Sequence, residues 1–372
     1  MHSSTSNSDI YITVRSVPPG NWLFALALGA VVFVLFGSYL EWRLAMRGFQ
    51  PGIVDTDATW KGQRDRASSL GNKAIILIGA SRIQLDVDLD IVREETSLTP
   101  VQLAIDGSSF IPVLEGLAND PAITGTVIVD YQNSDVNSLK PSGQSFLFEE
   151  EWERQDRRAT LPTFSSTESY LSAKLRSNLR SYADGARPLS SLMTRVLDAH
   201  AAPQYIVTSS TRTRLADYRM LRMPDFYLSR VRREVEFEAG HPIPIGDEQT
   251  TQDVQDSLQS EISKLSPAPY KGFEINTRRI ASMVSAIEKR GGKVIFVVMP
   301  ASGMVEEIVD KVYPREKFLD YFKATVGAPT VDVVDFPQFS RFWCPDGSHL
   351  DYRDRKQFTE ALVTLLRSQH AL

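Results

Sequence analysis

Five short apolar runs, separated by long stretches of helical periodicity, constrain the fold of this chain more than any other feature. The runs lie at 74–79, 100–105, 126–131, 293–299 and 330–335. Short apolar segments that alternate with helices are typical of a parallel sheet covered by helices on both faces. The clearest helices are expected at about 110–119, 272–290 and 353–369. The sequence therefore predicts an α/β protein, a three-layer α/β/α domain of the flavodoxin-like kind with its five strands in the order 2-1-3-4-5.

A second constraint is the uncharged apolar run from Trp22 to Leu40, whose length matches the ~20 residues that cross a bilayer core. A cleaved signal peptide usually has a shorter apolar core that ends in small residues, whereas this run ends in Tyr39-Leu40-Glu41-Trp42. A buried helix of a globular protein is the other alternative. We interpret 22–42 as a transmembrane anchor, with a flexible tail over 1–21 and a connector over 43–70.

The remaining residues, 71–372, are expected to form the α/β domain, with 136–271 as a mainly helical insertion between the third and fourth strands. Helical periodicity is clearest over Ser172–His200 and Tyr218–Glu238. Residues 154–233 contain fifteen Lys and Arg against six Asp and Glu. This excess indicates either an ordinary solvated face or a surface that contacts anionic lipid headgroups or an acidic polysaccharide.

Composition excludes several classes of function. The 372 residues carry a net charge of -5, which argues against nucleic-acid binding because phosphate binding usually requires a basic surface. The five histidines are scattered without the spacing of metal ligands, so we expect no metal site and no cofactor. The single cysteine, Cys344, cannot form an intramolecular disulfide and is expected to pack as a small apolar side chain.

Polar residues follow each predicted strand, and in a parallel sheet these positions meet at one edge. Ser81 follows the first strand, and Asp346 and His349 come after the fifth. A serine becomes a nucleophile when a histidine accepts its proton and a carboxylate holds that histidine in the right tautomer. We therefore predict Ser81 as nucleophile, His349 as general base and Asp346 as its orienting carboxylate, with Asp351 as the competing carboxylate.

Two further residues at this edge are candidates for binding the oxyanion. Gly107, after the second strand, can bring a backbone N–H close to a substrate oxygen, although it could equally be a simple turn glycine. Asn133, after the third strand, could donate its side-chain amide. Arg82 could bind a substrate anion, but an ion pair with Asp86 or Asp88 is the preferred interpretation.

Three blocks of the sequence resemble those of the SGNH (GDSL-like) hydrolase superfamily, in particular its membrane-anchored bacterial members encoded beside membrane-bound O-acyltransferases. The blocks are Gly79-Ala80-Ser81-Arg82, Asp106-Gly107-Ser108-Ser109 and Asp346-Gly347-Ser348-His349-Leu350. The resemblance implies a serine-dependent O-acyltransferase or esterase that forms an acyl-serine and acts on acyl esters, such as acetyl esters, of a cell-surface polysaccharide. It also implies an inner-membrane protein with an extracytoplasmic body and a multi-spanning O-acyltransferase as partner. Arg43 and Arg47, which follow the span, would by charge alone favour a cytoplasmic body.

The sequence departs from the family pattern at two places. Gly79-Ala80-Ser81 replaces the usual Gly-Asp-Ser, and the Gly-x-Asn-Asp block is absent, with 131–135 as its nearest candidate. The second departure motivates an alternative function, a non-catalytic polysaccharide-binding or assembly protein. The strands that precede Ser81 and His349 would lie three places apart, about 14 Å. Residues 336–349 must therefore fold back across the sheet, and we expect a Ser81 to His349 separation of about 2.6–3.2 Å.

Overall fold

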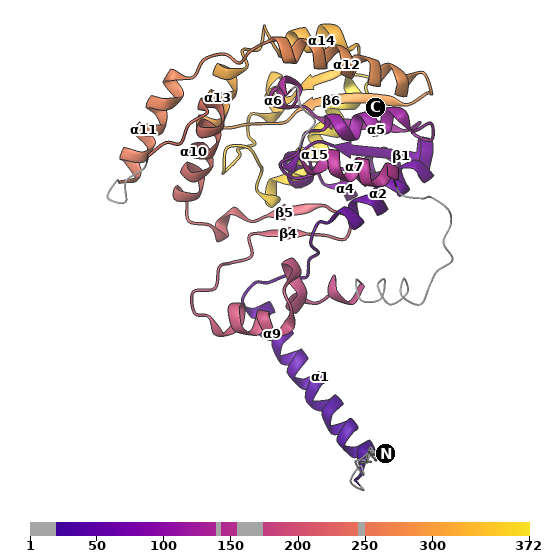
Figure 1. The fold of residues 1–372 in the computed structure, drawn as a ribbon, viewed down its shortest axis with the longest axis vertical. Coiled ribbons are helices and arrows are strands. Elements are labelled where there is room, and N and C mark those ends of the chain that lie inside the picture. The colour runs from indigo at the N-terminus through magenta and orange to yellow at the C-terminus, as the bar shows by residue number, and fades with distance from the viewer. Residues whose placement is uncertain (1–19, 139–142, 155–173, 245–249) are drawn as a thin grey trace, which may run out of the picture.

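The computed structural model describes residues 20–138, 143–154, 174–244 and 250–372. Its centre is a five-stranded parallel sheet with the order β2-β1-β3-β6-β7 (Figure 1). The strands are β1 (Ala74–Ile78), β2 (Thr99–Gln102), β3 (Thr126–Asp130), β6 (Lys293–Val298) and β7 (Thr330–Asp332). The five predicted strands and their order are confirmed, but β2 and β7 end earlier than predicted. After β7 the Asp332 carboxylate accepts the N–H of Val334 and starts the 3-10 turn η5 (Val333–Asp335).

The sheet has a core on each face, because consecutive strand residues point to opposite sides. On β1, Ile76 and Ile78 belong to one core, and Ile75 and Leu77 belong to the other. Helices that contribute to the first core are α2 (Asp57–Leu70), α5 (Ile111–Asn119), α6 (Asn133–Asn137), α7 (Gln144–Arg154), α10 (Asp225–Ala239), α11 (Thr251–Lys264), α12 (Lys271–Glu288), α13 (Met304–Val312) and α14 (Leu319–Val326). Helices on the second core are α3 (Ser81–Asp86), α4 (Leu89–Thr96) and α15 (Tyr352–Ser368). The helices predicted at 110–119, 272–290 and 353–369 are therefore confirmed as α5, α12 and α15.

Part of the segment predicted as a connector belongs to the sheet domain instead. Helix α2 begins at Asp57 behind a capping box of Thr56 and Thr59, and it buries Trp60 and Ala67 in the first core. The Trp60 indole N–H donates to the carbonyl of Leu103, 2.9 Å away, at the end of β2. The connection between α1 and the domain is therefore shorter than predicted.

The insertion contains a two-stranded antiparallel hairpin that the sequence did not predict, β4 (Ile206–Thr208) and β5 (Arg214–Ala216). Over 174–200, the described part of the predicted helix is broken into short pieces: a helical stretch at 174–176, then η2 (Arg180–Gly185), α9 (Pro188–Ser191) and the π-helical η3 (Leu192–Leu197). Non-helical Asp184, Gly185 at φ +78° and Pro188 break the helix there. The predicted helix over 218–238 is present as α10, behind the turn η4 (Tyr218–Met220). We call residues 174–200 the collar.

Helix α1 (Trp22–Met46) extends away from the rest of the molecule (Figure 1). Its mean hydropathy reaches 2.4, and it is long and apolar enough to span a membrane. The collar packs around its last turns, where Leu40, Leu44, Phe49 and Val196 form a small core. The Glu41 carboxylate accepts the backbone N–H groups of Arg180 and Ser181 at 2.8 and 2.9 Å, which fixes the collar to α1.

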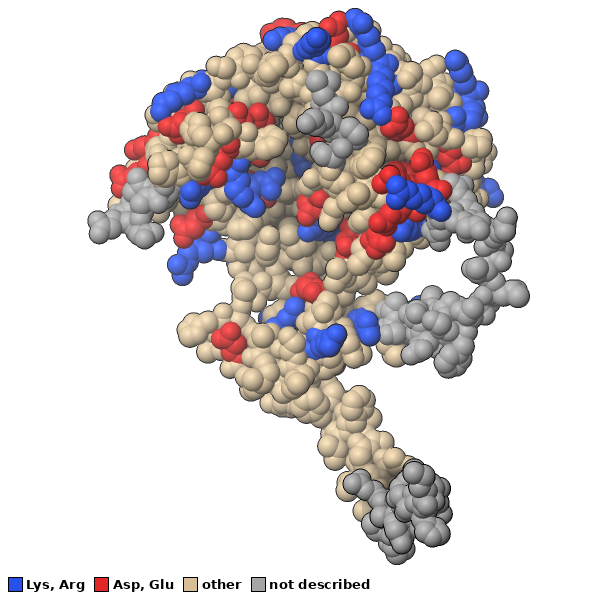
Figure 2. Space-filling view, viewed as in Figure 1, with Lys and Arg blue, Asp and Glu red and all other residues tan. Residues whose placement is uncertain are grey.

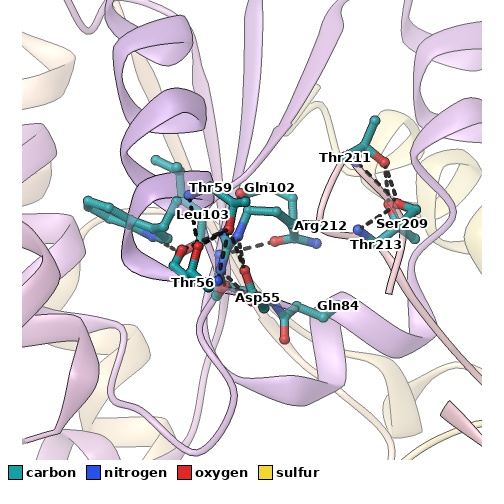
Figure 3. A network of polar contacts seen from close by, with 12 residues as sticks. Asp55, Thr56, Thr59, Gln84, Gln102, Leu103, Ser209, Thr211, Arg212 and Thr213 are labelled. Atoms are coloured by element: carbon teal, nitrogen blue, oxygen red, sulfur yellow. Dashed lines mark hydrogen bonds and ion pairs between the residues drawn. The ribbon is translucent and has the colours of Figure 1, made fainter. Parts of the chain in front are cut away.

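A buried polar network joins the loop of the hairpin and the segment before α2 to the sheet (Figure 3). The fully buried Arg212, in the loop of the hairpin, pairs with both oxygens of Asp55 at 2.6 and 2.8 Å. The same guanidinium donates to the carbonyls of Gln102 and Ala104, at and just beyond the end of β2. The carboxyl edge of the sheet therefore faces the hairpin, which lies on the side where α1 leaves (Figure 1).

Candidate active site

Ser81 lies at the carboxyl edge of the sheet, as the first residue of α3, three residues after the end of β1. The turn requires glycine at position 79, where φ is +139°. A Cβ on Gly79 would lie 2.5 Å from the Cβ of Asp130 on β3. The close approach of these two strands therefore depends on Gly79 and places the half-buried Ser81 at the edge.

The structure brings Ser81, His349 and Asp346 together. His349 Nε2 lies 2.7 Å from Ser81 Oγ, and His349 Nδ1 lies 2.8 Å from Asp346 Oδ2. The first distance falls within the expected range of about 2.6–3.2 Å. Because His349 and Asp346 are both buried, their contacts are shielded from competing water. The arrangement has the geometry that a serine, a base and an orienting carboxylate need for nucleophilic catalysis.

Asp346 is held as an anion by four donors. Its Oδ1 accepts the backbone N–H groups of Ser348 and His349, and its Oδ2 accepts His349 Nδ1–H and the Tyr218 hydroxyl at 3.0 Å. Burial alone would raise the pKa of Asp346, but the hydrogen bond and charge of His349, with help from Arg230, lower it to about 2. Burial and the nearby Asp346 raise the pKa of Tyr218, which stays a donor. With Nδ1 donating to Asp346, His349 presents Nε2 as its basic nitrogen to Ser81.

The loop that carries His349 folds back over the sheet, as predicted. Gly347 has φ +90°, and a Cβ there would overlap Val305. Its carbonyl accepts the N–H of Ser302, whose hydroxyl accepts the N–H of Cys344. Farther on, Leu350 N–H donates to Asp86 on α3 at 2.9 Å. The loop is thus fixed both to the segment after β6 and to the helix that begins with Ser81.

Cys344 is fully buried in the second core, which confirms that it packs as an apolar side chain. Burial raises the pKa of its thiol well above the usual range. The cysteine therefore supports the loop and offers no competing nucleophile.

The two candidates for oxyanion binding lie at the same edge. Asn133 opens α6 after β3, and its Oδ1 accepts the hydroxyl of Tyr131 at 2.7 Å, which leaves the amide N–H groups to donate elsewhere. Gly107 lies in an exposed turn after β2, with φ +63°. In the described structure no hydrogen bond joins either residue to Ser81. Their role as oxyanion donors remains a prediction.

Two predicted carboxylate partners are corrected by the structure. Arg82 pairs with the buried Asp130 at 2.8 Å, so the expected pair with Asp86 or Asp88 was wrong. Those carboxylates are engaged elsewhere, Asp86 by Leu350 N–H and Asp88 by Arg355 at 2.9 Å.

The competing carboxylate Asp351 makes no contact with the imidazole among the described residues. It caps α15 through the N–H of Arg353 and accepts the N–H of Tyr218 at 3.1 Å. Asp346 is therefore the carboxylate that orients His349.

Two cavities lie at the carboxyl edge of the sheet. One, of about 480 Å³, lies between the sheet and the hairpin and is lined by Asp106, Tyr205 and Arg214 among others. The other, of about 470 Å³, is lined by Arg82, Asn133 and Ala301 among others. Ser81 and His349 line neither, but Asp106 lies in the loop after β2 and Asn133 at the start of α6 after β3, and both of these strands pair with β1. Each cavity could hold one part of a substrate whose reacting atom lies at Ser81.

Sequence reasoning missed Tyr218 and Arg230. The Tyr218 hydroxyl reaches Asp346 from the insertion, and Arg230 on α10 donates to the Ser348 hydroxyl at 3.0 Å. Both residues lie more than a hundred positions before the loop of Asp346 and His349, and no local pattern in the sequence connects them with that loop. No protein-family model matches the sequence, and a search of curated proteins finds no match. The case for a function therefore depends on the geometry of the residues themselves.

Proposed function

We propose that this protein is a serine-dependent O-acyltransferase or esterase of the SGNH type. The observation that carries the proposal is the chain of contacts from Ser81 Oγ through His349 to Asp346, with distances of 2.7 and 2.8 Å. The substrates are acyl esters, in particular acetyl esters, of a cell-surface polysaccharide. This assignment of substrate rests on the resemblance of the three sequence blocks and on the helix α1.

In the proposed reaction, Ser81 Oγ attacks the carbonyl carbon of the donor ester, and His349 Nε2 accepts the hydroxyl proton. The bond to the leaving alcohol breaks, the alcohol takes this proton, and the acyl group stays on Ser81. A sugar hydroxyl or water then loses its proton to Nε2 and attacks the acyl carbon, and Ser81 recovers a proton as it leaves. The Asn133 amide and the Gly107 N–H are the proposed donors to the oxyanion.

The setting of this chemistry is also part of the proposal. The sheet domain is a flavodoxin-like fold, α1 anchors it in the inner membrane, and the body lies outside the cytoplasm. A multi-spanning membrane-bound O-acyltransferase supplies the acyl group. The polysaccharide is the acceptor or the source of the ester, and the scheme uses no metal ion or cofactor.

A fluorophosphonate probe tests the proposal, because it reacts with a serine hydroxyl only where a base activates it. The wild-type protein should be labelled, and Ser81→Ala should not. Ser134→Ala is the matched control, since Ser134 lies in α6 at the same edge and no hydrogen bond joins it to a histidine among the residues that the structure describes, and it should be labelled like the wild type. In cells, Ser81→Ala should abolish acyl-ester formation on the polysaccharide.

The labelling experiment and the measurement of ester formation in cells together distinguish the proposed enzyme from the non-catalytic alternative. Full ester formation by Ser81→Ala would refute the catalytic role of this serine. A folded wild-type protein that is not labelled but binds polysaccharide would instead be the non-catalytic binding or assembly protein considered above.

A further inference from the structure

The collar carries an apolar surface that the described protein leaves uncovered. Leu189, Met193 and Leu197 are 70, 56 and 63 % exposed and lie four residues apart along the continuous helical run of α9 and η3. Residues at this spacing share one face of a helix. Val196 of the same run is buried against α1, and Leu192 is partly buried beside it. The collar therefore uses one side to hold α1 and turns a row of large apolar side chains outward.

The length of α1 determines how far this apolar row would lie from the centre of a bilayer that α1 spans. The collar begins to bury α1 at Leu40, so Trp22–Tyr39 is the part left exposed. At ~1.5 Å per residue this part is about 27 Å long, close to the ~30 Å thickness of a hydrocarbon core. Tyr39 and Trp42, with ring centroids 6.0 Å apart, lie at the upper limit, where aromatic side chains meet the headgroups. The collar thus starts where the hydrocarbon ends.

Charge identifies the kind of surface that the collar fits. Its basic residues outnumber the two acidic ones, Asp184 and Asp198, and are Lys174, Arg176, Arg180, Arg187 and Arg195. Figure 2 shows basic side chains on the collar directly above the uncharged shaft of α1. Arg195 pairs with Asp184, and Arg180 donates to the carbonyl of Phe49. Lys174, Arg176 and Arg187 are exposed.

We infer that the collar is a membrane-binding surface for anionic lipid. Leu189, Met193 and Leu197 enter the upper acyl region, and Lys174, Arg176 and Arg187 bind lipid phosphates. Exposed apolar side chains beside basic ones are the pattern of segments that lie in the plane of the interface. The inference does not depend on the proposed enzymatic function. It accounts for part of the basic excess of the insertion, whereas Arg212, Arg214 and Arg230 serve contacts inside the body.

The test uses the full chain in lipid nanodiscs, with single cysteines that carry an environment-sensitive fluorophore. Leu189→Cys and Met193→Cys probe the collar. Ile275→Cys is the control, because Ile275 is also an exposed apolar residue, 51 % exposed, but lies on α12 at the far end of the body (Figure 1). The native Cys344 is fully buried, and unmodified protein treated in the same way gives the background.

Nitroxide lipids should quench the fluorophore at 189 and 193 several-fold more than at 275, and aqueous iodide should show the opposite order. Equal quenching by iodide at all three sites would overturn the inference. Protection from both quenchers would also overturn it, since protein would then cover the collar. Quenching by nitroxide lipids should increase when phosphatidylglycerol replaces phosphatidylcholine, and Arg176→Gln with Arg187→Gln should remove the increase. Identical quenching in both lipids would refute the role of the basic residues.

Discussion

Replacing Tyr218 with phenylalanine tests whether the insertion takes part in the proposed catalysis. The change removes the hydroxyl that donates to Asp346 Oδ2 at 3.0 Å, but it keeps the ring that packs against Tyr205 and Phe226. A hydrogen bond to a charged group contributes about 1.5–3 kcal/mol, and Asp346 retains three other donors. If this energy holds the imidazole in place, its loss lowers kcat by about 10- to 150-fold. KM should stay unchanged, because the Tyr218 hydroxyl binds Asp346 and not the substrate.

Hydrolysis of p-nitrophenyl acetate by the full chain in detergent measures both constants. Tyr352→Phe is the control, since its hydroxyl contacts Arg219 rather than Asp346, and it should keep the wild-type kcat. Circular dichroism of each variant confirms that the fold is intact. A folded Tyr218→Phe protein with a kcat within about twofold of wild type would refute the reasoning, because the hydrogen bond would then contribute nothing to the orientation of His349.

Three further predictions concern the framework of the site. Arg212→Met leaves Asp55 without its cation and removes one donor each from the carbonyls of Gln102 and Ala104, so it should lower the free energy of unfolding by about 3–5 kcal/mol in urea titrations; a loss below about 1 kcal/mol would contradict the role of the network. Gly79→Ala should cost about 2 kcal/mol or more in the same titrations and abolish fluorophosphonate labelling, because its Cβ would overlap Asp130; wild-type stability would show that the strands can separate freely. Since folding lowers the pKa of Asp346 to about 2 from a usual value near 3.8, the stabilisation is complete above about pH 4 and is lost as the pH falls towards 2. Asp346→Asn should therefore reduce this acid-induced loss of stability by about 2 kcal/mol, and equal pH dependence in both proteins would disprove the assignment.

The sheet and the meeting of Ser81 with His349 could be predicted because both follow from local patterns. Runs such as Ala74–Ile78 are apolar on both faces, which only a covered parallel strand requires. Once the strands are placed, the rule that loops after parallel strands share one edge brings the distant residues together. The positions of Asp346 and His349 within one tight loop made the orienting carboxylate predictable as well.

The other parts of the site depend on contacts that no local pattern records. Tyr218 binds a residue 128 positions away, and Arg212 binds one 157 positions away. Helix α2 was missed because only a few of its residues, including Trp60 and Ala67, are buried, which leaves its apolar periodicity weak. Its capping box at Thr56 and Thr59 was the available signal.

The short path from α1 to the sheet has a consequence for how the Ser81 edge meets other molecules. A long flexible linker would let the body explore a volume of solution. Here the chain is held at Gln50 by Gln204, at Ile53 by the carbonyl of Thr208, and at Asp55 by Arg212, within ten residues of the end of α1. With α1 in a bilayer, the Ser81 edge keeps one distance from that bilayer and travels only by lateral diffusion. The rate of encounters at this edge then depends on the number of molecules per unit of membrane area. Because the body cannot extend into bulk solution as it could on a long linker, a molecule must come to the membrane surface to meet Ser81.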